Sequence, residues 1–537
     1  MTSGAAVLST GWPVWPIAGP AADLLWGETG GRTFDAARGN STQVLGALQR
    51  ALAEAPAPGR SAREFVELSG ALALEGATFD RVWSDPRAYA WTRTAHALAT
   101  TGPEDALAEH LDQFKAFALG VAYRSGRDCK LDTPLPAAFP FAIPGTRLSL
   151  DGAGPVAISG IVAGRLRVTV GGEEHEVALG AVGEVQANGL ILHQCPHARA
   201  RDYSLPLHPH ALHLRGLAVG EPAVRAGLAY HARHAGLVAR ALALIERHAP
   251  DSFEAFRRII RLIGLKPLAW GGFDDFSPAE MPGAFVASVI ENPFVLADHF
   301  IHELQHNRLQ LIEEGGPLFE AGTGEEARYY SPWRDKPRGL YGIFHGVYVF
   351  VGVQQFWAAV HAAPEVGGDD RTFALDRLLR LPVQLELALA VLQGHARLTA
   401  LGRLILEQLT LDVARIRRAA AGAGLPADCP ALTVGEDGVY LPEIGASGGG
   451  PLSVRAALLE HIRRTRRTRR GSSARASGSS IDLLPHHAGE RRHHPRLPED
   501  RRRGRRRPSR AHGVRGALRR AHASRRHLLL RGSGAAH

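Results

Sequence analysis

Apolar residues recur at three- and four-residue spacing along much of the chain, a period typical of α-helices with a buried face. Near the N-terminus this spacing predicts helices over Thr42–Glu54 and Ser61–Leu74, each opening on Ser or Thr. The stretch Arg81–Thr101 is expected to continue as helix after the break at Pro86. The same spacing predicts helices later in the chain over Val224–His248, Phe253–Ile263, Val295–Ile312, Gly342–His361, Phe373–Gly394 and Leu398–Arg418.

Between Arg147 and Val185 the period changes to two, which is typical of strands. Leu166, Val168 and Val170 alternate with polar residues, Gly171-Gly172 supplies a turn, and Val177 and Leu179 alternate again. A second, short hairpin is predicted over Leu432–Ile444, around Asp437-Gly438. We therefore expect a mainly α fold with a smaller β-rich element, of the α+β class.

These patterns divide the chain into five segments. They are an N-terminal helical region (1–140), a β-rich insertion (141–220), a helical core (221–430), a short hairpin and helix (431–462), and a basic tail (463–537).

The net charge of +10 is concentrated in the tail. Residues 463–537 contain 23 arginines and four acids, a net charge of +19, so residues 1–462 carry −9. The tail has no apolar periodicity with which to build a core, and its Arg, Pro, Gly and Ala content is typical of out-of-frame translation of GC-rich coding sequence. We therefore expect a disordered tail without function. Nucleic-acid binding by a run such as Arg501–Arg507 is the less favoured alternative.

Cysteine content and hydropathy indicate a cytoplasmic protein. Cys129, Cys195 and Cys429 are odd in number and far apart, which argues against a disulfide framework. The stretch Met1–Glu28 has no basic start, and no uninterrupted apolar window of about 18 residues occurs. We expect neither secretion nor membrane insertion.

The strongest chemical signal is the pentapeptide His302-Glu303-Leu304-Gln305-His306, within a predicted helix. Histidines four residues apart project from the same face of a helix, so both can bind one divalent metal beside Glu303. His299, three residues before His302, is expected to pack or to support a ligand. The metal site is therefore predicted on a helix of the helical core.

Two histidines leave a divalent ion under-coordinated, so a third protein ligand is needed. Glu326 follows His306 by 20 residues, a separation at which thermolysin-like zinc peptidases have a glutamate ligand, but glycines precede it. His345 opens the apolar run Val347–Trp357 and could face the metal helix. Both candidates stay open at this point.

The surroundings of His345 resemble a known family. The segment Ser331-Pro332-Trp333-Arg334-Asp335-Lys336-Pro337-Arg338-Gly339-Leu340, together with His345, Phe356-Trp357 and the metal pentapeptide, resembles the HExxH-motif peptide-modification family. Weaker likenesses are Pro86 with Trp91 and the run Leu398–Gly402. The resemblance covers about residues 80–420. Members of this family are regarded as 2-oxoglutarate-dependent peptide β-hydroxylases of natural-product peptide maturation.

The resemblance implies an oxygenase that binds Fe(II) through His302, His306 and His345 and uses 2-oxoglutarate and O₂ on a precursor peptide. A guanidinium grips a carboxylate with two hydrogen bonds, so Arg334 and Arg338 are the candidates for binding 2-oxoglutarate. Glu303 would then orient a ligand, water or substrate, whereas in the alternative zinc peptidase it is the general base. A non-enzymatic peptide-binding scaffold with a structural metal is the third possibility.

Overall fold

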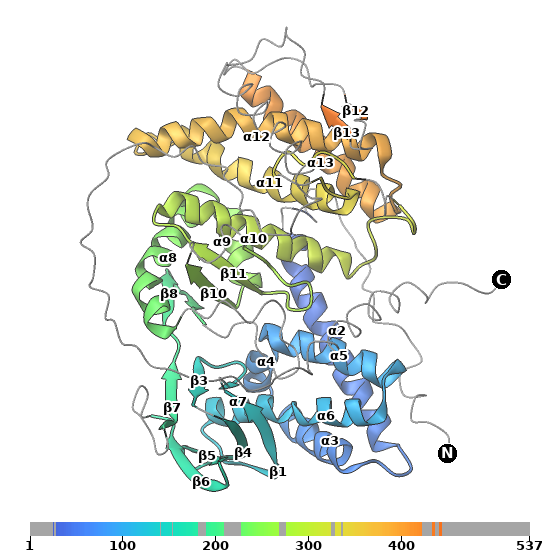
Figure 1. Ribbon diagram of the computed structural model, residues 1–537, viewed down its shortest axis with the longest axis vertical. Coiled ribbons are helices and arrows are strands. Elements are labelled where there is room, and N and C mark those ends of the chain that lie inside the picture. Colours follow the sequence, from blue (N-terminus) through green and yellow to red (C-terminus); the bar gives the residue numbers. More distant parts are fainter. Residues whose placement is uncertain are drawn as a thin grey trace, which may run out of the picture. The chain divides into compact units, whose positions relative to one another are not determined.

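The computed structural model describes residue 25 and residues 28–139, 141–152, 154–180, 189–208, 227–267, 275–323, 328–334, 337–421, 432–434 and 440–442. Helices dominate these residues and the strands form small sheets, which confirms the predicted mainly α fold with a smaller β-rich element (Figure 1). All described residues belong to one compact unit, Met1–Ile481. The predicted tail and the helix predicted before it lie outside the described residues.

The N-terminal helices pack around a cluster of aromatic side chains centred on Trp91. The helices are α2 (Glu28–Ala53), α3 (Arg60–Ala73), α4 (Ala77–Trp83), α5 (Pro86–Thr101), α6 (Glu104–Asp112) and α7 (Lys115–Ser125). Asp85 begins α5: its carboxylate accepts a hydrogen bond from the Arg87 backbone N–H at 3.0 Å, and Pro86 occupies the first turn. The predicted break at Pro86 is confirmed.

The β-rich element begins earlier than predicted, inside the segment expected to be helical. Its main antiparallel sheet has the order β1-β4-β5-β6. The strands are β1 (Cys129–Ala138), β2 (Phe141–Ala142), β3 (Leu148–Asp151), β4 (Pro155–Val162), β5 (Arg165–Val170), β6 (Glu173–Ala178), β7 (Ile191–Gln194), β8 (His197–Ala200) and β9 (Tyr203–Pro206). The predicted hairpin is confirmed as β5 and β6, joined at Gly171-Gly172. β1 contains two prolines and pairs with β4 across an irregularity, so it lacks the alternation that marks β5.

The helical core opens with α8 (Leu228–His248) and α9 (Pro250–Ile259), followed by the parallel strands β10 (Leu262–Pro267) and β11 (Ala284–Val289). The predicted helix Phe253–Ile263 is therefore wrong at its end, where the chain leaves α9 for β10. A short apolar run has the same composition in a buried strand as in a buried helix, and periodicity alone does not separate them.

The remaining helices are α10 (Pro293–Glu313), α11 (Leu340–Ala362), α12 (Gly368–His395) and α13 (Ala400–Ala421), close to their predicted bounds. α11, α12 and α13 pack on one another, yellow to orange in Figure 1, and α11 also packs on α10. α11 is long and apolar enough to cross a membrane, but 78% of its most apolar window is buried inside the protein. The predicted late hairpin is confirmed as β12 (Leu432–Val434) and β13 (Tyr440–Pro442).

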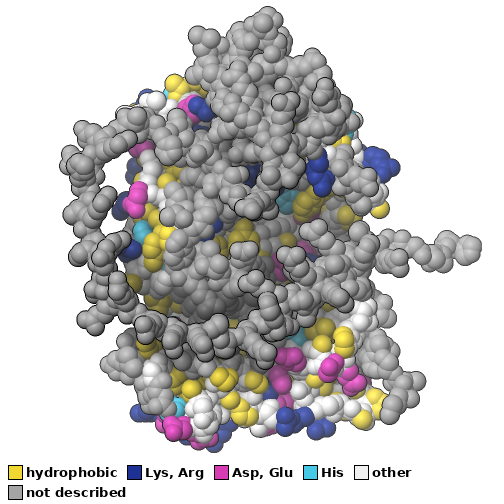
Figure 2. Space-filling model, in the orientation of Figure 1, with side chains coloured by type: hydrophobic (Ala, Val, Ile, Leu, Met, Phe, Trp, Pro, Cys, Tyr) yellow, Lys and Arg dark blue, Asp and Glu magenta, His cyan; other side chains and the backbone are white. Residues whose placement is uncertain are grey.

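Ion pairs join the N-terminal helices to the core. Arg93 of α5 pairs with Glu314 at the end of α10 at 2.5 Å, and Arg258 of α9 pairs with Asp35 of α2 at 2.6 Å. Where described residues are visible in Figure 2, acidic and basic side chains are interspersed on the surface.

Candidate metal centre

α10 supplies the metal-binding motif and is held rigidly. The Asn292 side chain accepts hydrogen bonds from the backbone N–H groups of Phe294 and Val295, at 2.8 and 3.2 Å, and Pro293 follows at the first helical position. From Val295 onward nearly all its side chains are buried. The partly exposed ones form a single polar stripe of residues three or four apart: His299, His302, His306, Gln310 and Glu313.

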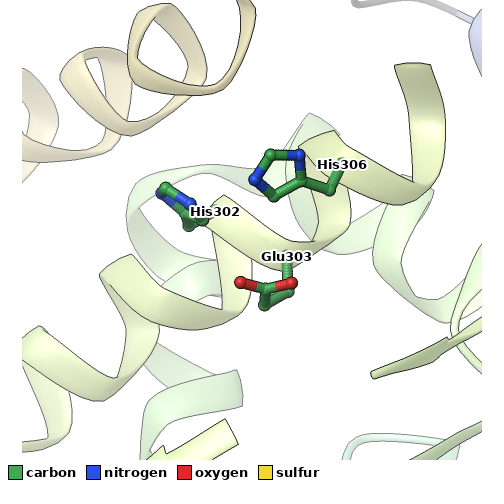
Figure 3. Close-up of side chains that lie close together, drawn as sticks. All are labelled: His302, Glu303 and His306. Atoms are coloured by element: carbon green, nitrogen blue, oxygen red, sulfur yellow. The ribbon is translucent and has the colours of Figure 1, made fainter. Parts of the chain in front are cut away.

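The motif residues lie together as the sequence predicts. One potential ligand atom each of His302, Glu303 and His306 lies within 4.8 Å of those of the other two. Figure 3 shows both imidazoles projecting from the same side of α10, with the Glu303 carboxylate below them in this view. The helical spacing therefore brings two nitrogen ligands to one position, as metal binding requires.

α11 runs antiparallel to α10 and brings His345 to this stripe. The rings of His302 and Phe350 are 5.1 Å apart, and those of His306 and His345 are 5.5 Å apart. The Nδ1 atoms of His306 and His345 are separated by 3.3 Å. Two nitrogens bound to one ion at about 2.0–2.1 Å are about 3.0–3.4 Å apart, so this pair has the spacing of two ligands of the same metal.

The loop before α11 brings Arg334 and Arg338 to the same site. Trp333 stacks on Phe350 at 4.8 Å, and Tyr329 and Arg338 exchange backbone hydrogen bonds at 2.8 and 2.9 Å, which closes the loop on itself. A side chain at Gly346 would come within 2.5 Å of the Trp333 ring, so glycine there permits the loop to approach α11. Among the described residues, neither guanidinium has a carboxylate partner.

The electrostatics of the site favour neutral imidazoles. Burial and, next, His306 lower the pKa of His302 well below its usual range, and Arg334 adds to this effect. Burial, followed by His345, Arg334 and Arg338, lowers the pKa of His306 to about 3. Burial and Arg334 also lower the pKa of Arg338. The charges of both arginines therefore act on the site, and the neutral imidazoles keep lone pairs that can bind metal.

The Glu303 side chain is held by a hydrogen-bonded chain of polar side chains. Ser277 Oγ donates a hydrogen bond to its carboxylate at 2.7 Å, and the Asn307 side-chain amide donates to Ser277 Oγ at 2.8 Å. Glu303 is 1% exposed, and burial, with Asp275 second, raises its pKa to about 8. Its carboxyl group is therefore held in one orientation beside the imidazoles.

His299 has a partner that supports it. Its Nδ1 lies 2.5 Å from the carboxylate of Asp275, which also accepts a hydrogen bond from the Ser288 N–H at 2.6 Å. Although burial acts in the opposite direction, Asp275 raises the pKa of His299. His299 thus belongs to a buried acid–histidine pair at the end of the stripe, which fits the supporting role predicted for it.

The other ligand candidate, Glu326, lies outside the described residues, and two tryptophans of the resembling segments lie in the core. Glu326 and the neighbouring Glu325 are not among the described residues. Trp333 and Trp357, which belong to the segments that carry the family resemblance, are 5% and 0% exposed and pack in the core.

Sequence reasoning missed Asp275, Ser277, Glu313 and Phe350. Glu313 could have been found, because it follows His306 by seven residues and therefore lies on the same helical face. Asp275 and Ser277 precede β11 and reach α10 only through tertiary packing, so local patterning holds no signal for them.

Comparison of the chain with models of known protein families and with curated proteins found no match. The site geometry and the sequence motifs are therefore what support a function for this protein.

Proposed function

We propose that this protein is an Fe(II)- and 2-oxoglutarate-dependent oxygenase that hydroxylates a β-carbon in a ribosomally made peptide. The observation that supports it best is the group of histidines on α10 and α11, whose pKa values are lowered in part by Arg334 and, for His306, Arg338. Neither arginine has a carboxylate partner among the described residues. A metal with open positions, beside arginines that have no carboxylate partner in the described part of the chain, suits a reaction whose cosubstrate is a dicarboxylate. The peptide substrate and the modified carbon are proposed from the sequence resemblance.

His302, His306 and His345 would hold the metal. The 3.3 Å between the His306 and His345 nitrogens suits shared coordination, and the low pKa of His306, caused by burial and by His345, keeps it an electron-pair donor. When bound, Fe(II) supplies the activation of O₂ against a C–H bond. The overall reaction converts the peptide C–H, O₂ and 2-oxoglutarate into the peptide C–OH, succinate and CO₂.

Arg334 and Arg338 would bind a carboxylate of 2-oxoglutarate. Two like charges close together, one of them partly desolvated, repel unless an anion lies between or beside them. 2-Oxoglutarate has one carboxylate beside its keto group, which would bind the metal, and a second carboxylate that would bind the arginines. The Tyr329–Arg338 hydrogen bonds and the Trp333–Phe350 stack would hold the loop that bears both side chains.

Zinc-dependent peptide hydrolysis is the second candidate, and the position of Glu303 favours it. Its buried carboxyl group lies beside the motif imidazoles, where a peptidase has its general base. In the oxygenase, Glu303 would instead orient water or substrate. The third candidate is a peptide-binding scaffold in which the metal is structural.

Localisation and partners follow from the same proposal. Cys129 and Cys195 are both free thiols, which suits the reducing cytoplasm that we propose for the reaction. A precursor peptide is the proposed partner, and neither membrane nor nucleic acid is required.

The proposal is tested on protein reconstituted anaerobically with Fe(II) and then exposed to O₂ with 2-oxoglutarate. We expect succinate from the wild type, little from His302→Ala or His306→Ala, and one added oxygen atom in the precursor peptide when the correct one is supplied. Failure of the iron-loaded protein to form succinate would overturn the oxygenase. Peptide cleavage by zinc-loaded protein, abolished in Glu303→Gln and indifferent to 2-oxoglutarate, would establish the peptidase. Tight metal retention with neither reaction would support the scaffold.

A further inference from the structure

Glu313 lies at the end of the polar stripe, two helical turns beyond His306. Its side chain is 20% exposed, and Tyr341 donates a hydrogen bond from its hydroxyl to Glu313 Oε2 at 2.8 Å. The same oxygen lies 3.7 Å from Nε2 of His345. The ring of Tyr341 covers that of His345 at 4.3 Å. A partly buried carboxylate therefore faces the side of the His345 ring that points away from His306.

The two ring nitrogens of His345 have different surroundings. Nδ1 faces His306 Nδ1 at 3.3 Å, whereas Nε2 is buried and has no hydrogen-bond partner among the described residues. A neutral imidazole has one N–H and one lone pair, and the neighbours of the ring decide which nitrogen has which. A lone pair on Nε2 would be repelled by the negatively charged Glu313 oxygen, whereas an N–H at Nε2 would be attracted to that oxygen.

We propose that Glu313, steadied by Tyr341, is a positioning residue that fixes the tautomer of His345. The proton is held on Nε2, toward Glu313, and the lone pair on Nδ1 is directed at the metal beside His306. This rests on the proposed function only in that a metal takes the Nδ1 lone pair; the tautomer itself is a property of the metal-free protein. Closing the gap from 3.7 Å to a hydrogen bond of about 2.8 Å requires a shift of roughly 1 Å, within what binding tightens in such sites.

The direct test is the nitrogen NMR spectrum of the metal-free protein labelled with ¹⁵N-histidine, with the His345 signals assigned by their loss in His345→Asn. Protonated and unprotonated ring nitrogens resonate in separate ranges. We expect the His345 proton on Nε2 in the wild type. A proton on Nδ1, donated to His306, would overturn the proposal whatever the protein catalyses.

The second test is Co(II) affinity and the visible spectrum of the Co(II) protein. Loss of a carboxylate that orients a histidine ligand typically weakens metal binding 10- to 100-fold, so we expect about that for Glu313→Gln and a smaller loss for Tyr341→Phe, each with an altered spectrum. Glu407→Gln, at an exposed acid on α13, is the matched control and should leave both unchanged. Wild-type affinity and spectrum in folded Glu313→Gln and Tyr341→Phe would overturn the proposal. If both tests succeed but iron-loaded protein forms no succinate, the oxygenase fails and the role of Glu313 stands.

Discussion

Arg334 and Arg338 are two arginines that influence the motif histidines and lack a carboxylate partner among the described residues. Arg377, by contrast, is held by the carboxylate of Asp298 at 2.5 Å. Arg334 and Arg338 lie in one loop beside the motif histidines, and neither has such a partner among the described residues. Arg334 is also a cause of the shifted pKa values of His302, Glu303 and His306, although burial is the largest cause for each. Within the proposed function, this makes Arg334 the stronger candidate for contact with a metal-bound dicarboxylate.

We therefore predict that Arg334→Ala raises the 2-oxoglutarate concentration needed for half-maximal succinate formation. Loss of a bidentate charged contact costs about 2–5 kcal/mol, which corresponds to at least a roughly 30-fold increase. Arg334→Lys retains the charge but not the planar guanidinium, so the 2-oxoglutarate concentration that it needs should lie between those of the wild type and of Arg334→Ala. The control is Arg240→Ala, at an exposed position on α8, which should match the wild type. Equal 2-oxoglutarate dependence of Arg334→Ala, Arg338→Ala and the control would remove both arginines from the site.

At the scale of elements, the site depends on how closely α10, α11 and the preceding loop approach one another. Gly346 lies against the Trp333 ring, and Gly352 lies against the buried side chain of Gln305, where an added Cβ would be 2.7 Å from its nitrogen. A Cβ at either position would force neighbours apart by several tenths of an ångström. The two glycines therefore set the spacing that lets His345 meet His306 and lets the loop reach the histidines.

Gly346→Ala tests this dependence. The added methyl group would meet Trp333 at 2.5 Å, and overpacking of this kind typically costs about 1–3 kcal/mol of unfolding free energy. Because Trp333 precedes Arg334, we also expect weaker binding of 2-oxoglutarate. Gly236→Ala on α8 is the control: nothing lies within 4 Å of its Cβ, so it should stabilise by about 0.5–1 kcal/mol. Urea unfolding of the wild type and the two variants measures the changes in unfolding free energy, and the 2-oxoglutarate dependence of succinate formation measures the change in binding. A Gly346→Ala variant as stable as Gly236→Ala would contradict the close approach.

At the scale of the whole molecule, the charge is divided between an acidic body and a strongly basic tail. Residues 1–462 carry −9 and residues 463–537 carry +19. The described residues already contain the motif helix, its antiparallel partner, the arginine loop and the hydrophobic core around them. All the residues proposed to form the site are thus among the described residues, which end before the tail.

We predict that deleting the residues after Gly471 leaves folding and succinate formation unchanged, because that sequence has no apolar periodicity with which to pack. Thermal unfolding and succinate formation of the full-length and shortened proteins should coincide. A loss of several degrees in Tm on deletion would show that the tail packs on the body.

The sequence by itself determined those features whose information is local. Helical spacing placed His302 and His306 on one face of α10, and alternation about Gly171-Gly172 predicted β5 and β6, because both patterns repeat over a few residues. It also singled out His345 as a possible ligand, both from its place before an apolar run and through family resemblance, and Arg334 and Arg338 through the resemblance. The start of the β-rich element was predicted too late, since β1 contains prolines and an irregular pairing that weaken its alternation. The parallel pair β10 and β11 was missed because a buried apolar run is ambiguous.

Only the tertiary structure decided how distant residues complete the site. The contact of His345 with His306 spans 39 residues, and those of Asp275 with His299 and Ser277 with Glu303 span 24 and 26 residues. These contacts depend on the packing of α10 against α11 and on the segment before β11. The packing of α10 and α11 depends in turn on small residues such as Gly346 and Gly352. The repeat of a helix or strand constrains neighbours a few residues apart, whereas close packing of whole elements fixes the distances on which coordination, hydrogen bonding and charge interactions depend.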